Sequence, residues 1–103
     1  MTNTQMDSNM KTPHELATER MKLSEEFSHY SGELAKLIKV EAEHYNKNRE
    51  NYKSDTAVKK AFEVTEDGVK ITVIKLKLKS LTTKMSAIKT MLETLTEEAR
   101  GLY

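Results

Sequence analysis

The last third of the chain carries a main seam of apolar side chains whose intervals alternate between three and four residues without a break: Ile71, Ile74, Leu78, Leu81, Met85, Ile88, Leu92, Leu95, Ala99 and Leu102. This spacing lines up one apolar stripe along a helix that packs lengthwise against another helix. A facing seam lies upstream, with Arg20 at one of its positions: Leu16, Leu23, Phe27, Tyr30, Leu34 and Leu37. The two seams predict a pair of long helices.

Cap signals predict where the helices begin. Thr12 and Pro13 begin a first helix that is expected to run to about Tyr52. Ser54 and Asp55 cap a short helix that is expected to extend to about residue 64. Thr65 then caps a third helix, expected over residues 66–100, with acidic side chains in its first turn.

One stretch, residues 71–79, also suits a strand, because β-branched side chains and alternating lysines favour extended structure. The main seam runs through it without a change of phase, which favours helix. We therefore predict an all-α fold, an antiparallel coiled-coil-like hairpin of two long helices with a short connecting helix. Residues 12–103 form this single domain, and residues 1–11 form a disordered polar tail.

The composition of the chain excludes several kinds of site and several classes of protein. The chain has no cysteine, which excludes disulfides and thiolate metal sites. No apolar stretch is long enough to span a bilayer and the start does not look like a signal peptide, so we expect a cytoplasmic protein. His14, His29 and His44 stand ~22 Å apart along one helix, cannot share a metal ion, and are expected to be solvated. No nucleophile has a credible base, so we expect no enzyme, cofactor or metal.

Charge is distributed unevenly. Residues 36–84 hold twelve basic and seven acidic side chains, whereas both ends of the chain are acidic. After the chain reverses, nine cations are expected at one end of the hairpin: Lys47, Arg49, Lys53, Lys59, Lys60, Lys70, Lys75, Lys77 and Lys79. Tyr45 and Tyr52 interleave with them. Cations that follow phosphates and rings that stack on bases are what binding of single-stranded nucleic acid requires. The alternative is a solvated face with ion pairs between helices and packed tyrosines.

A second stripe on the last helix, the outer stripe, consists of apolar and small side chains: Val69, Val73, Leu76, Ser80, Thr83 and Ala87. A two-helix hairpin would leave it exposed, and exposed apolar patches of this extent mark interfaces. We therefore expect a homo-oligomer that pairs through the outer stripe. In the alternative, the short helix folds back and covers the stripe.

On the first helix, Glu41 falls on a seam position, where it could be a buried residue that specifies register.

The chain resembles the UvsY-type recombination mediators of tailed phages and the small phage proteins grouped with them. The resemblance covers residues 15–100 in size and order of elements. It rests on Val40-Glu41-Ala42 before a basic helix end, on Thr56-Ala57-Val58-Lys59-Lys60-Ala61, and on Ser86-Ala87-Ile88-Lys89.

The resemblance implies a helical, ring-forming protein that binds single-stranded DNA. Such a protein helps to load a RecA-like recombinase onto strands coated by single-strand-binding protein, in phage recombination and repair. The family's basic helix end would correspond to Lys47, Arg49 and Lys53. His44 and Tyr45 stand where more lysine would be expected. The competing hypothesis is a helical scaffold or adaptor that acts only through protein contacts, such as a phage inhibitor of a host protein.

Overall fold

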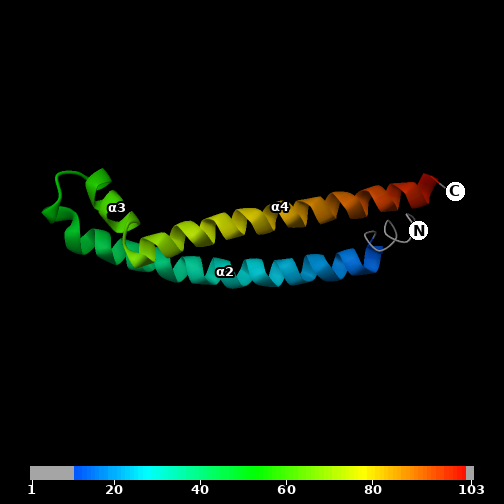
Figure 1. The fold of residues 1–103 in the computed structure, drawn as a ribbon, viewed down its shortest axis with the longest axis horizontal. Helices are drawn as coiled ribbons and strands as arrows, with labels where there is room; N and C mark the ends of the chain where they lie inside the picture. The colour runs from blue at the N-terminus through cyan, green and yellow to red at the C-terminus, as the bar shows by residue number, and fades with distance from the viewer. Residues whose placement is uncertain (1–10, 102–103) are drawn as a thin grey trace, which may run out of the picture. The chain divides into compact units, whose positions relative to one another are not determined.

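The computed structural model describes residues 11–101, and every regular element within this range is a helix (Figure 1). α2 spans Pro13–Asn48, the 3₁₀ turn η1 spans Arg49–Asn51, α3 spans Asp55–Glu63 and α4 spans Glu66–Gly101. The predicted all-α hairpin with a short connecting helix is confirmed.

The strand-like stretch at residues 71–79 lies inside α4, so the seam predicted its structure correctly. The first long helix ends slightly before the expected position. Its α-helical part stops at Asn48, whose side-chain amide donates to the His44 carbonyl oxygen at 2.9 Å and satisfies one of the last helical acceptors. After η1, Tyr52 is extended, with φ −123° and ψ 153°.

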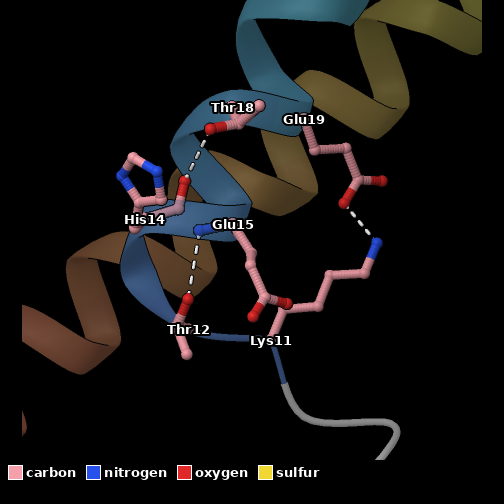
Figure 2. Close-up of polar contacts among 6 residues, drawn as sticks. All are labelled: Lys11, Thr12, His14, Glu15, Thr18 and Glu19. Carbon is pink, nitrogen blue, oxygen red and sulfur yellow. Dashed lines mark hydrogen bonds and ion pairs between the residues drawn. The ribbon is translucent and has the colours of Figure 1, made fainter.

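The predicted caps are in place. Thr12 Oγ1 accepts the Glu15 amide at 3.1 Å at the start of α2 (Figure 2). Ser54 Oγ accepts the Ala57 amide at 3.2 Å, and Thr65 Oγ1 accepts the Gly68 amide at 3.1 Å. Each side-chain oxygen thus satisfies an amide that has no acceptor within its own helix.

Of the predicted tail, residues 1–10 lie outside the described residues. Lys11 is described, and its ammonium group forms an ion pair with Glu19 on the second turn of α2 (Figure 2). Because both side chains are exposed, this pair contributes little stability.

Packing divides the chain into two compact units, and both long helices run through both units. In the first unit, α2 up to Glu26 packs against α4 from Leu81 onward. Leu16, Leu81 and Ile88 are its buried residues. The other seam positions in this unit are half-buried as far as Leu95: Leu23, Met85, Leu92 and Leu95. Arg20, between Leu16 and Leu23 in the facing seam, and Ala99, near the end of the main seam, are exposed, and Leu102 lies outside the described residues.

The second unit runs from Phe27 to Ser80 and includes α3. Its core consists of Val58 and Phe62 from α3 and Ile71 from α4. The remaining seam residues of this unit are half-buried: Phe27, Tyr30, Leu34, Leu37, Ile74 and Leu78. The seams predicted from spacing are therefore the packed faces within each unit. That residues 12–103 form one domain stays a prediction.

The prediction for Glu41 is wrong, because its side chain is exposed. Beyond Leu37 the packed side of α2 rotates, as expected when a straight helix departs from a seven-residue repeat. His44, Tyr45 and Asn48 are half-buried there, and His44 and Tyr45 contact α3.

Gly68 fixes the corner between α3 and α4. It is buried in the first turn of α4, directly against the last turn of α3. A Cβ added at this position would lie 2.8 Å from Glu63 Cα and still closer to the Phe62 carbonyl oxygen. Only glycine permits this approach of two backbones.

Candidate nucleic-acid interface

The nine predicted cations are all exposed and fall into two groups. Four of them belong to α4, namely Lys70, Lys75, Lys77 and Lys79. The other five, the loop-end cations, belong to the end of α2, the connection and α3: Lys47, Arg49, Lys53, Lys59 and Lys60.

Lys70 and Lys77 of α4 have partners within their own unit. Lys70 Nζ lies 3.4 Å from Glu66 Oε1, one helical turn away. Lys77 Nζ lies 4.6 Å from the centre of the Tyr30 ring, at cation–π distance. Neither contact is the ion pair between helices that the alternative hypothesis expects, since the Lys70 pair lies within α4 and Lys77 contacts an aromatic ring.

The loop-end cations differ from Lys70 and Lys77. No ion pair in the described chain joins any of the five to a carboxylate within 4.0 Å. Their segment is also rich in positive charge, since Glu50 and Asp55 are the only acidic residues between Lys47 and Lys60. The ammonium and guanidinium groups are thus accessible to an anionic chain.

The two tyrosines occupy different environments. Tyr52 is 41% exposed and lies in the extended connection between η1 and α3. Tyr45 is half-buried, and its hydroxyl donates to Asp55 Oδ1 at 2.6 Å. Tyr52 is therefore the ring that is free to stack on a base, while Tyr45 ties α2 to the first residue of α3.

The contact with Asp55 changes the ionisation of Tyr45. The hydrogen bond to the carboxylate, helped by desolvation and by the negative charge itself, raises the pKa of the phenol above its ordinary value. The positive charge of Arg49 opposes this shift. Tyr45 is accordingly a protonated donor over the physiological range.

A shallow groove of about 310 Å³ lies beside this hydrogen bond, between α2 and α3. Its polar lining includes the carboxylates of Glu41 and Asp55 together with Lys59. The two carboxylates outnumber Lys59 in this lining and make the groove a poor phosphate site.

The expectation that the histidines are solvated holds for His14 and His29, which are exposed, and is wrong for His44. The His44 ring is half-buried with its centre 5.2 Å from that of Phe62, and its Nδ1 is buried without a hydrogen-bond partner. Spacing alone did not reveal this contact because it depends on α3 folding back onto α2. Within residues 11–101, no three His, Asp or Glu side chains are grouped so as to hold a metal ion.

The outer stripe is exposed along its whole length. Val69, Val73 and Leu76 are 51%, 55% and 65% exposed. The alternative in which the short helix covers the stripe is therefore wrong, because α3 uses Val58 and Phe62 to pack and leaves these three side chains in solvent.

Comparisons with models of protein families, with curated proteins and with solved structures find none that this chain matches. The resemblance to UvsY-type mediators therefore stays a prediction. None of the described helices is long and apolar enough to cross a membrane.

Proposed function

We propose that the chain is a non-catalytic protein that binds single-stranded nucleic acid through the loop-end cations and Tyr52. The observation that carries the proposal is that the five loop-end cations are exposed, lie close in sequence and form no ion pair in the described chain. Exposed cations without an ion pair can neutralise phosphates and release counterions without first breaking a salt bridge.

The connection suits a single strand better than a duplex. A duplex hides its base faces, whereas an unpaired strand presents them to an exposed ring such as Tyr52. Phosphate contacts carry no sequence information, so binding is expected to be sequence-tolerant.

The resemblance noted above extends this proposal to a biological role. Binding would then serve to load a RecA-like recombinase onto DNA covered by single-strand-binding protein, in phage recombination and repair. The protein would act as a homo-oligomer in the cytoplasm of a bacterial host.

Salt dependence of binding to a labelled single-stranded oligonucleotide tests the proposal. If each loop-end cation neutralises one phosphate, the logarithm of the binding constant falls with the logarithm of salt concentration with a slope of about 3.5 in magnitude. Charge reversal at Arg49 and Lys53 removes two contacts and should lower that magnitude by about 1.4. Reversal at Lys22 and Lys89, two exposed lysines of the first unit, makes the same change in net charge and should leave the slope near the wild-type value.

The ring of Tyr52 is tested separately. Tyr52→Ala should weaken binding by ~1–3 kcal/mol if the ring stacks on a base, whereas Tyr52→Phe should retain most of the affinity. Absence of binding at low salt, or equal weakening by both pairs of charge reversals, would refute the proposal.

A second function, a protein adaptor, is favoured by the exposed apolar side chains of α4. Val69, Val73 and Leu76 offer a surface for another protein and are separate from the loop-end cations. Wild-type binding of a protein partner that is abolished by Val73→Glu and unaffected at Arg49 and Lys53 would support the adaptor instead.

A further inference from the structure

A hollow of about 490 Å³ lies where α3 meets α4 in the second unit, and we call it the corner groove. The residues that define it here come from the end of α3, the residue that follows it and the start of α4: Phe62, Glu63, Val64, Val69, Val73 and Lys75. Phe62 is buried, whereas Val64 is 80% exposed. The lining of the groove therefore includes both the packed ring of Phe62 and a valine that projects into solvent.

Several exposed apolar side chains gather on this surface. Val64, Val69 and Val73 line the groove, and Leu76 continues the apolar face along α4. Leaving these side chains in water forgoes the free energy that burial of apolar area provides. Val64 projects into solvent beside the hollow, so Val64 of a second copy can enter the hollow of the first.

The charges decide which surfaces of two copies can pair. Lysines border the outer stripe on both sides, with Lys70 and Lys77 on one edge and Lys75 and Lys79 on the other. Two copies that met stripe on stripe along α4 would place lysine rows beside lysine rows, which is unfavourable. Pairing along the length of α4 is therefore disfavoured.

The corner groove does not have this problem, because it carries both signs of charge. Glu63 at the end of α3 and Glu41 on α2 line it together with Lys75 of α4. Around a twofold axis, a contact from Glu63 of one copy to Lys75 of the other is repeated in the opposite direction. The groove thus carries charges of both signs that can pair between two copies.

We propose that two copies of the chain associate face to face through the corner groove, with Val64 of each copy in the groove of the other. A pairing of this kind is closed after two subunits. It differs from the ring that the resemblance implies, and it uses Glu63, Val64 and Lys75, which the outer stripe does not include. It is independent of nucleic-acid binding, since the loop-end cations do not line the groove.

Sedimentation equilibrium of the full chain, from micromolar to millimolar concentration, tests the proposal. The wild type should approach twice the chain mass of 11.8 kDa. Glu63→Lys and Lys75→Glu should each weaken the dimer by roughly tenfold or more, because each reversal turns two attractive contacts into two repulsive ones. The double variant Glu63→Lys/Lys75→Glu should restore association, since the two charges exchange places.

Val64→Ser provides a test that does not involve charge and should also weaken the dimer. The side chains of Glu63, Val64 and Lys75 are all exposed, so circular dichroism should show unchanged helicity in each variant. A wild type that stays monomeric at the highest concentration would overturn the proposal. So would a larger assembly, or a double variant that associates no better than the single ones.

Discussion

Replacing Gly68 by alanine tests the geometry that holds α3 against α4. In an open helix, alanine is more favourable than glycine by ~1 kcal/mol. At Gly68 the added Cβ would instead lie 2.8 and 2.9 Å from two backbone atoms of Glu63, and closer still to the Phe62 carbonyl oxygen. Because backbone atoms cannot rotate away as a side chain can, the start of α4 would have to shift.

The expected cost follows from these contacts. Overpacking of this kind costs ~1–3 kcal/mol. A shift of α4 would also strain the hydrogen bond from the Gly68 amide to Thr65 Oγ1, and loss of such a cap costs ~1 kcal/mol. After subtraction of the helix-propensity gain, Gly68→Ala should destabilise the fold by about 1–3 kcal/mol.

Gly32 provides the matched control, because a Cβ there would meet no atom within 4 Å. Gly32→Ala should therefore stabilise the protein by ~0.5–1 kcal/mol. Thermal and urea unfolding, followed by circular dichroism at 222 nm as the usual helix signal, measures both variants. A Gly68→Ala variant as stable as Gly32→Ala would refute the close approach of α3 and α4.

Three further changes test other parts of the structure. Leu81→Ala removes a buried seam residue and should lower the free energy of unfolding by ~2–5 kcal/mol in urea unfolding. Tyr45→Phe should remove, from an absorbance titration, a phenol whose pKa lies above the ordinary value for tyrosine. Because the folded-state pKa of Tyr45 is raised, the stability from its bond to Asp55 is present below about pH 10 and is lost as pH rises through the folded pKa. Val73→Glu should abolish self-association in sedimentation experiments, because Val73 lines the corner groove and the change places an unpaired charge between the two copies.

The helices and their packed faces followed from local pattern. Alternating steps of three and four residues identified the buried positions Leu81 and Ile88, and side-chain chemistry identified the caps Ser54 and Thr65. Both signals depend on neighbours within a few residues, so the chain need not be folded for them to be recognised.

The corner around α3 did not follow from such patterns. The packing of His44 on Phe62, the bond from Tyr45 to Asp55 and the close approach at Gly68 all depend on how α3 folds back. Periodicity along one helix contains no information about that direction. The same limit applies to the cations, because sequence could not distinguish Lys77, which lies over the Tyr30 ring, from Lys53, which forms no ion pair in the described chain.

Nuclear magnetic resonance mapping with a single-stranded oligonucleotide tests the central claim most directly. In low salt, amide shifts should change from Lys47 to Lys60, with the Tyr52 ring protons moving upfield as a base stacks on them. Signals of the corner groove, such as the Val64 and Val69 methyl groups, should stay in place. Shifts confined to α4, or no shifts at saturating oligonucleotide, would contradict the assignment of the loop-end cations and Tyr52 as a nucleic-acid interface.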